Sequence, residues 1–305
     1  MARFGLRARG PATRVLAERI QPRTVLKTMR RTFAASLILI FPVIAGAAAP
    51  ETSGTGSVPA AVSRPATTED LALLTGALTK VARDMNRWAY TETLLVKDEK
   101  GRVKQNRIVR HDPSLPYAQQ DVPAQIDGKP PTEAQLKDFR SRGEKRGRRI
   151  ERGEPADRQD LSGQSVGELV DLPRALVVGD DGKRVTYELP LRQVGNTRFP
   201  PEKFQVLVRV AKDGQRLERA EVRLREPLRT KLVVKISSGE AGADFTTIDP
   251  KYGPAMTAVR GNASASILFI HVGGSGDVTR TDLKHVRPFA ERFDVQIGPL
   301  KALDF

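Results

Sequence analysis

The stretch that decides the fold reads FQVLVRVAKDGQRLERAEVRL and runs from Phe204 to Leu224. Apolar and polar residues alternate on both sides of the turn sequence Ala211-Lys212-Asp213-Gly214. Alternation with a period of two places the apolar side chains of a strand on one face. The stretch therefore predicts two antiparallel strands joined by a tight turn, with one dry face and one wet face.

The same alternation recurs between about Val185 and Ile297, and a Trp-led hairpin, Trp88 to Val96 and Val103 to Val109, precedes it. A further short strand is expected around 124–126. We therefore expect about ten strands and two or three helices, an α+β fold that is mostly antiparallel β. A sheet of this size curls because strands twist. The predicted architecture is a strongly curved sheet, a half-barrel, whose concave face is covered by helices.

Three parts of this series carry more specific predictions. The stretch from Ser264 to Val272 is apolar at most positions past Ser266, which is typical of a central strand buried on both faces. The Gly-rich run from Gly273 to Gly276 predicts a hairpin turn with positive φ. Separate strands are expected from Leu232 to Ile236 and from Phe245 to Ile248.

An amphipathic helix is predicted from about 68 to 86, ahead of the hairpin. Thr67 or Thr68 can cap its first turn, where Glu69 and Asp70 favour the positive end of the helix dipole. Its apolar positions step by three and four residues and form one stripe. The stripe either packs on the sheet as ordinary core or acts as a lid over a cavity. It consists of Leu71, Leu74, Leu78, Val81 and Met85.

A second helix is expected at about 132–152, as a basic insertion in the domain. Thr132 and Gln135 have the spacing of a capping box. From Lys137 to Arg152 the segment has eight basic and three acidic residues. Its charged face is either simply solvated or contacts an anionic membrane surface. The cations assigned to that contact are Arg140, Arg142, Lys145, Arg146, Arg148 and Arg149.

The N-terminus predicts export. A basic region ending in Met29-Arg30-Arg31, an apolar run and the small-residue site Ala45-Gly46-Ala47 form a signal-peptide pattern over residues 1–47. Translation starts at Met1 or at Met29, and an uncleaved membrane anchor is the alternative to cleavage. The segment carries nine Lys and Arg and one Glu, so its removal lowers the formal net charge from +15 to about +7.

The remaining composition indicates the compartment. Residues 48–66 are rich in Pro, Gly, Ser and Ala and predict a flexible linker, which leaves 67–305 as a single domain. The chain has no cysteine, which excludes disulfides and thiolate chemistry. Export without cysteine is typical of the bacterial periplasm, where stray thiols are oxidised. Export also argues against nucleic acid as a partner, and no aromatic stacking platform accompanies the basic residues.

No catalytic or metal-binding constellation is apparent. The chain has three histidines, His111, His271 and His285, without the short spacings of a metal site. His111, beside Asp112, is expected to form a local hydrogen bond. The run 273–276 matches neither a nucleophile elbow nor a phosphate loop. We therefore predict a protein that is not an enzyme and that uses no metal or cofactor.

Three short motifs resemble sequences of a known family. They are Asp112-Pro113-Ser114 with Pro116, the run DGKPPT at 127–132 that leads into QLKDFR at 135–140, and REPLR at 225–229. With the order of elements, they make residues 68–300 resemble the lipoprotein-carrier superfamily of the bacterial periplasm (the LolA, LolB and RseB half-barrel), and within it the outer-membrane lipoprotein-sorting-like proteins. The resemblance implies a concave apolar face that binds or senses the acyl chains of lipoproteins.

The expected function is therefore the binding of an acyl chain, a lipid or a lipoprotein in an apolar half-barrel cavity, without catalysis. The alternative is a structural or protein-interaction module of the cell envelope that has no ligand. The oligomeric state stays open. The apolar parity of the strands selects the residues that would line the cavity, which are Trp88, Tyr90, Val206, Val208, Val210, Leu232, Val234 and Ile236.

Overall fold

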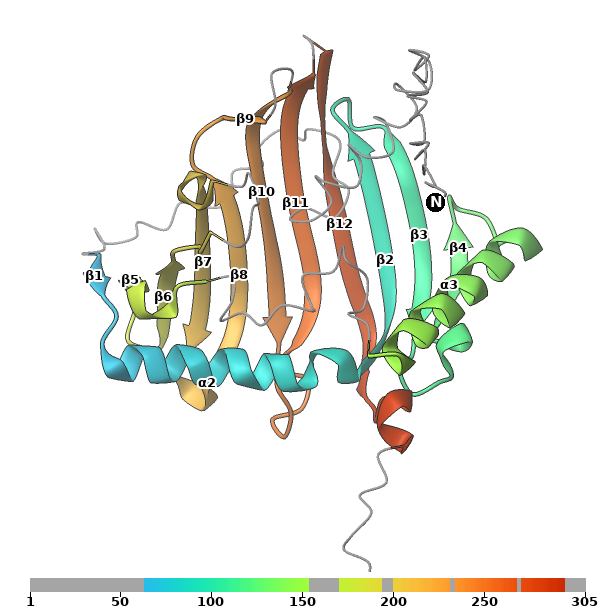
Figure 1. Ribbon diagram of the computed structural model, residues 1–305, viewed down its shortest axis with the longest axis horizontal. Coiled ribbons are helices and arrows are strands. Elements are labelled where there is room, and N and C mark those ends of the chain that lie inside the picture. The colour runs from blue at the N-terminus through green and yellow to red at the C-terminus, as the bar shows by residue number, and fades with distance from the viewer. Residues whose placement is uncertain (1–62, 154–169, 194–199, 231–233, 268–269, 294–305) are drawn as a thin grey trace, which may run out of the picture.

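The structure, a computed structural model, describes residues 63–153, 170–193, 200–230, 234–267 and 270–293. They form one antiparallel sheet of 12 strands with two α-helices, α2 (Thr68–Asp84) and α3 (Glu133–Glu151) (Figure 1). The strands are β1 (Arg64–Pro65), β2 (Trp88–Asp98), β3 (Val103–His111), β4 (Asp121–Ile126), β5 (Leu176–Asp180), β6 (Arg184–Leu189), β7 (Phe204–Ala211), β8 (Arg216–Leu224), β9 (Leu228–Thr230), β10 (Val234–Thr246), β11 (Ala255–Ile267) and β12 (Ile270–His285).

The strand order across the sheet is β1-β5-β6-β7-β8-β10-β11-β12-β2-β3-β4, and β9 pairs with β10 beside this path. The mostly antiparallel β class is confirmed, with 12 strands where about ten were expected. The sheet is open and not strongly curled. The half-barrel, with helices over a concave face, therefore stays a prediction.

Cross-strand register arranges the apolar residues in two continuous rows. Residues directly opposite each other in an antiparallel ladder point to the same face of the sheet. The first row crosses the sheet from β5 to β2 and consists of Val177, Tyr187, Val208, Ala220, Ala243, Val259, Val278 and Leu94. The second row lies two residues away along each strand and consists of Leu189, Val206, Val222, Ala241, Gly261, Gly276 and Val96.

The opposite face of the sheet is charged. Glu221 of β8 accepts hydrogen bonds from Arg219 and Arg223. Asp244 of β10 pairs with Arg219 at 2.9 Å and with Arg260 of β11 at 3.1 Å. The dry face and the wet face expected from the period of two are therefore both present.

Helix α2 packs on the apolar residues of β5 to β8, and Figure 1 shows it crossing the strands near one end of the sheet. Thr67 caps the helix in a capping box with Asp70, as the sequence indicated. Asp70 also pairs with Arg64 of β1 at 2.5 Å. The hydrogen bond from Arg64, helped by Thr67 and opposed by burial, lowers the pKa of Asp70 to about 2. The helix start is thereby tied to the edge strand.

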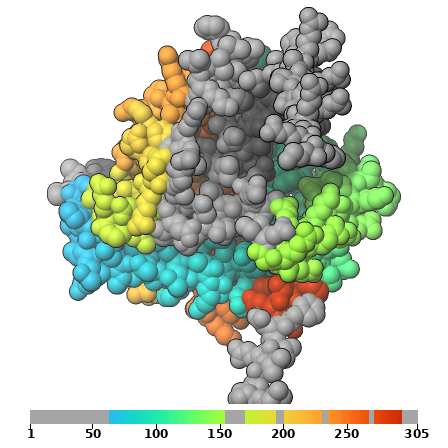
Figure 2. Space-filling view, in the orientation of Figure 1, coloured from blue at the N-terminus to red at the C-terminus, as the bar shows by residue number. Residues whose placement is uncertain are grey.

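Helix α3 packs closely on a 3-10 turn, Tyr117–Gln119, through two buried glycines. A Cβ at Gly143 would lie 2.1 Å from the Tyr117 carbonyl oxygen, and one at Gly147 would lie 2.3 Å from Cδ2 of Tyr117. Only glycine permits this approach. The predicted capping box of Thr132 and Gln135 is present at the start of the helix. In Figure 2, α2 and α3 are both seen on the viewed side of the molecule.

Three strand predictions are wrong. Residues 234–246 form one strand, which pairs with β11 along its length. The middle of this strand is rich in Ser, Gly and Ala, so its sequence shows no alternation of apolar and polar residues. Residues 264–267 belong to β11 and residues 270–272 belong to β12, and the ladder of the two strands brings Ile267 opposite Ile270. Gly273 to Gly276 lies inside β12, and a Cβ at Gly273 would approach the Ala263 carbonyl oxygen to 2.9 Å. Close strand approach, not positive φ, requires glycine there.

The described fold also extends beyond one expected boundary. Arg64 and Pro65, placed in the linker by composition, form the edge strand β1 against Val177 and Leu176. Ile297 and the signal-peptide segment 1–47 lie outside the described residues.

Leu74 tests whether the sheet depends on α2. Its side chain is fully buried over the apolar rows. We expect Leu74→Ala to lower the free energy of unfolding by about 2–5 kcal/mol, because the substitution removes buried methyl groups and leaves a cavity. Leu115→Ala, at an exposed position, is the control and should change it by less than about 0.5 kcal/mol. Equal losses in urea denaturation would contradict this placement of α2.

Candidate functional site

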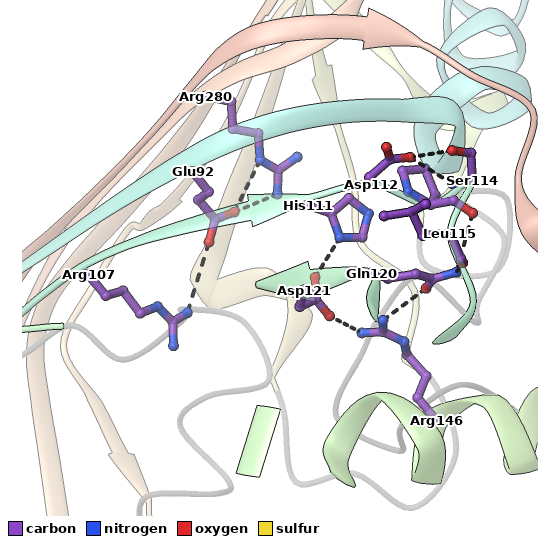
Figure 3. A network of polar contacts seen from close by, with 11 residues as sticks. Glu92, Arg107, His111, Asp112, Ser114, Leu115, Gln120, Asp121, Arg146 and Arg280 are labelled. Carbon is purple, nitrogen blue, oxygen red and sulfur yellow. Dashed lines mark hydrogen bonds and ion pairs between the residues drawn. The ribbon is translucent and has the colours of Figure 1, made fainter. Parts of the chain in front are cut away.

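A polar cluster interrupts the apolar face where β2, β3 and β4 end the sheet (Figure 3). Arg107 of β3 stands opposite Leu94 and therefore continues the first apolar row. Glu92 of β2 and Arg280 of β12 stand opposite each other in the next row on the same face. Charged groups at such positions are costly to bury unless they are paired.

Arg280 and Glu92 form the fixed part of this cluster. Two nitrogens of Arg280 donate to Glu92 Oε2 at 3.2 and 3.1 Å, and both side chains are 18% exposed. The Arg280 guanidinium also lies 4.1 Å from the centroid of the Tyr90 ring. An ion pair and a cation–π contact together hold this arginine in one orientation.

Arg107 is held less completely. Its Nη2 lies 4.0 Å from Glu92 Oε1, at the limit of an ion pair and beyond hydrogen-bond distance. Its Nε is buried and has no hydrogen-bond partner within the described ranges. One carboxylate, Glu92, therefore stands between two guanidinium groups and satisfies only one of them.

A second polar chain lies beside the first and includes α3. Asp121 of β4 is 2.6 Å from His111 Nδ1 and 2.8 Å from Arg146 Nη1. Arg146 also donates to Gln120 Oε1 at 3.0 Å. Burial disfavours the charge on Asp121, but the hydrogen bond from His111 and the charge of Arg146 outweigh it and lower its pKa to about 2.

Tyr90 links the two chains. Its ring stacks on His111 with centroids 4.8 Å apart, while Arg280 covers it within cation–π distance. Burial raises the pKa of Tyr90 to about 12, so the phenol stays protonated at neutral pH. His111 bonds to Asp121 and not to its sequence neighbour Asp112, so the expectation of a local partner for His111 is wrong.

The loop after β3 holds this arrangement together. Asp112 accepts from the Ser114 amide at 2.9 Å and from its hydroxyl at 2.6 Å. Gln120 is buried and donates to the carbonyl oxygens of Pro113 and Leu115 at 3.3 and 2.9 Å. The same Gln120 accepts from Arg146 of α3, so the proline-rich motif fixes the helix relative to the sheet.

A small apolar pocket lies between α2 and this polar cluster. Four residues from the predicted lid and lining sets meet there, namely Val81, Met85, Trp88 and Tyr90, with Arg280 at the rim. Its volume is about 10 Å³, which is room for about one water molecule. Its other walls are Phe245, Pro254 and Met256.

The other predicted lining and lid residues fall in different surroundings. Val206, Val208 and Val210 are buried directly beneath α2, where Leu74 and Val81 are buried and Leu71 and Leu78 are half-buried. Ile236 is half-buried opposite Ala265. Val234 pairs through its backbone with Ile267, and Leu232 lies outside the described residues. Met85 is 43% exposed.

An aromatic cluster closes the end of α2 onto the sheet. The ring of His285 stacks on Tyr252 at 3.6 Å between centroids, and Trp88 meets both rings edge-on. Asp84 at the helix end accepts from the Gly253 amide at 2.6 Å and lies 3.7 Å from His285 Nε2. Burial opposes ionisation of Asp84, but the hydrogen bonds from Arg83 and Gly253 lower its pKa.

The cations predicted to contact an anionic surface divide into three groups. Arg146 points inward to Asp121, as described, and Arg149 is half-buried. Arg140 and Arg142 are exposed but pair with Glu133 at 3.8 Å and Asp138 at 2.9 Å on the same helix. The remaining members, exposed and without an ion-pair partner in the described part of the chain, are Lys145 and Arg148.

The residues that build the polar cluster were not selected from the sequence. Glu92, Arg107 and Arg280 each occupy a strand position at which the alternation predicts an apolar residue. A charged residue at such a position is the signal in the sequence that identifies them. Asp121 and Gln120 carry no such signal, because they follow the irregular segment 112–119.

No group of three or more His, Asp or Glu side chains in the described ranges is placed to hold a metal ion. Among the same residues, no helix is long and apolar enough to cross a membrane. Comparison with known protein families, with curated proteins and with solved structures finds no match for this chain.

Arg146 and Arg148 are a matched pair of cations for testing the second polar chain. Arg146→Gln should lower the free energy of unfolding by about 1–3 kcal/mol at neutral pH, because it leaves Asp121 half-buried without a full charge partner. Arg148→Gln, at an exposed position, should change it by less than about 0.5 kcal/mol. Urea denaturation measures both.

The pH dependence follows from the sign of the Asp121 shift. Its folded pKa is about 2, below the usual 3.8, so its pairing stabilises the fold fully above about pH 4 and less as the pH falls toward 2. The difference between wild type and Arg146→Gln should shrink over this window. A difference that is unchanged between pH 5 and pH 2.5 would show that Arg146 acts through something other than Asp121.

Proposed function

We propose that this is an exported protein of the cell envelope that binds an acyl chain, from a lipid or a lipoprotein, along the apolar face of its sheet. The observation that carries the proposal is the extent of the two apolar rows, which continue past α2 across β10, β11 and β12 to β2. Over these central strands the rows consist mostly of small residues. A strip of Ala, Gly and Val suits a hydrocarbon chain, because it offers apolar surface without bulk.

Larger side chains border this strip. Tyr187 belongs to the first row on one side, and Leu94 belongs to it on the other. A half-barrel that bends around such a strip, with α2 as its lid, is the architecture we propose for the bound state. We place the protein in the periplasm because of its signal-peptide pattern and its lack of cysteine.

Helix α2 must move for a chain to enter beside Trp88, since the pocket there has a volume of only about 10 Å³. Two of its attachments are polar. Lys80 Nζ donates to the Gly214 carbonyl at 2.6 Å, and Tyr187 donates to the Asp70 carbonyl at 3.0 Å. Such bonds contribute about 1 kcal/mol each, but opening also exposes the buried Leu74, Ala77 and Val81, so the acyl chain must replace this apolar contact.

The alternative function is a structural or protein-interaction module with no ligand. The small volume of the pocket favours it, because ligand sites usually measure several hundred Å³. The two proposals differ in whether α2 opens, which can be measured.

The chain has no cysteine, so two introduced thiols can lock α2 cleanly. A Cβ at Gly76 would lie 3.2 Å from Gln215 Cδ, which places these positions on either side of the contact between α2 and the β7–β8 turn. We expect wild type purified from envelopes to carry lipid in native mass spectrometry. The variant Gly76→Cys with Gln215→Cys, stripped of lipid and joined by a short bismaleimide, should fail to take it up again.

Each single cysteine variant, treated with the same reagent, is the control and should take up lipid as wild type does. Lipid-free wild type in every preparation, with no uptake of added fatty acid, would contradict the acyl-binding function and leave the structural module. Uptake by the cross-linked protein would contradict the lid role of α2.

We further propose that α3 rests on an anionic membrane surface through exposed cations that have no ion-pair partner among the described residues. Lys145 and Arg148 lie on the helix surface, and each cation near an anionic leaflet contributes about 1 kcal/mol. Arg146 is excluded from this role by its bond to Asp121. The contact would hold the protein where acyl chains are available.

Vesicle sedimentation tests the contact. Lys145→Glu with Arg148→Glu should reduce co-sedimentation with phosphatidylglycerol vesicles by about tenfold or more, because two attractions become repulsions. Lys183→Glu with Lys235→Glu makes the same change in net charge at exposed positions away from α3 and should have a smaller effect. Equal losses in the two double variants would mean that net charge alone drives binding.

A further inference from the structure

We infer that Arg107, beside the Arg280–Glu92 pair, binds the anionic headgroup of the amphiphile whose chain lies on the apolar rows. The ligand class is a single-chain amphiphile ending in a carboxylate or a phosphate. This inference rests on the proposed acyl-binding function and specifies the chemistry at one end of the ligand.

The position of the two arginines is the first argument. Arg107 is the continuation of the first apolar row beyond Leu94, and Arg280 lies on the same face one row away. A chain lying along the row therefore ends at a pair of guanidinium groups. Arginine suits this place because its planar fork binds carboxylate or phosphate through two parallel hydrogen bonds.

The charge balance is the second argument. Three arginines of the cluster, Arg107, Arg146 and Arg280, share two carboxylates, Glu92 and Asp121, since the third carboxylate, Asp112, bonds to Ser114 in its own loop. Asp121 is shared by His111 and Arg146, and Glu92 is engaged by Arg280 at 3.1 Å. Arg107 is therefore the arginine of the three that lacks a close carboxylate among the described residues, and an anion binding there would supply one.

The unsatisfied donor is the third argument. Arg107 Nε is buried without a hydrogen-bond partner in the described part of the chain, and Glu92 is 4.0 Å away from the nearest guanidinium nitrogen. A buried donor of a charged group that lacks an acceptor is destabilising. An anionic oxygen beside Arg107 would supply an acceptor for Nε, next to the Arg280–Glu92 pair that Tyr90 helps to keep in place.

Binding of three ligands with one chain measures the headgroup preference directly, by isothermal titration calorimetry. The ligands are dodecanoic acid, dodecyl phosphate and the neutral dodecanol, each below its micelle-forming concentration.

In wild type we expect the acid or the phosphate to bind about tenfold or more tightly than the alcohol. Arg107→Gln should abolish this preference and leave the affinity for the alcohol unchanged, which also shows that the variant is folded. Arg107→Lys should keep part of the preference. Arg110→Gln, on the same strand but exposed on the other face, is the matched control and should behave as wild type.

The outcomes separate the two proposals. Equal affinities of wild type for acid, phosphate and alcohol would overturn the headgroup site while leaving acyl binding intact. No binding of any of the three ligands would overturn the proposed function itself. A preference for the acid over the phosphate points to a free fatty acid, and the reverse preference points to a phospholipid-derived amphiphile.

Discussion

The register of the β-ladder is the constraint on which the rest of this structure depends. Two apolar rows cross the sheet, and the positions between them carry Glu221, Arg260 and Asp277 on the other face. A slip of one residue in any strand would exchange the two faces and bury these charges. The charge pairs on the wet face contribute little energy themselves, but they make the wrong register costly. Helix α2 and the loop that carries Tyr252 and Gly253 then have one defined face to cover.

The composition of the central strands sets the shape of that face. In β10, β11 and β12 the rows contain Ala241, Gly261 and Gly276, whereas β7 contributes Val206 and β2 contributes Val96. Small side chains leave this part of the apolar face less raised than its surroundings, and they contribute little packing energy of their own. Residues of this kind weaken a strand. The central strands therefore hold together mainly through their backbone hydrogen bonds, which their lengths of 13 and 16 residues make numerous. The sheet thus has its longest strands where its side chains are smallest.

The sequence predicted those parts of the fold in which local pattern and tertiary structure agree. The alternation of Phe204–Leu224, the caps at Thr67 and Thr132 and the hairpin after Trp88 all depend on neighbouring residues. The predicted limits of β10, β11 and β12 were wrong because a stretch of Ser, Gly and Ala shows no alternation of apolar and polar residues. The polar cluster was not predicted for another reason. The partners of Arg280 and Arg146 lie 188 and 25 residues away in the chain, so no local pattern joins them. Only the parity of Glu92, Arg107 and Arg280 hinted that polar groups meet on the dry face.

The polar cluster can be interpreted as a structural network or as a binding site, and the three arginines distinguish the two. A purely structural network is stable when every buried donor is satisfied, and Arg146 and Arg280 meet this condition through Asp121, Gln120 and Glu92. Within the described residues, Arg107 Nε does not. An apolar residue opposite Leu94 would continue the row and avoid the cost of a half-satisfied charge. A guanidinium at that position is therefore unfavourable for folding alone, and the anion that we propose there would offset this cost.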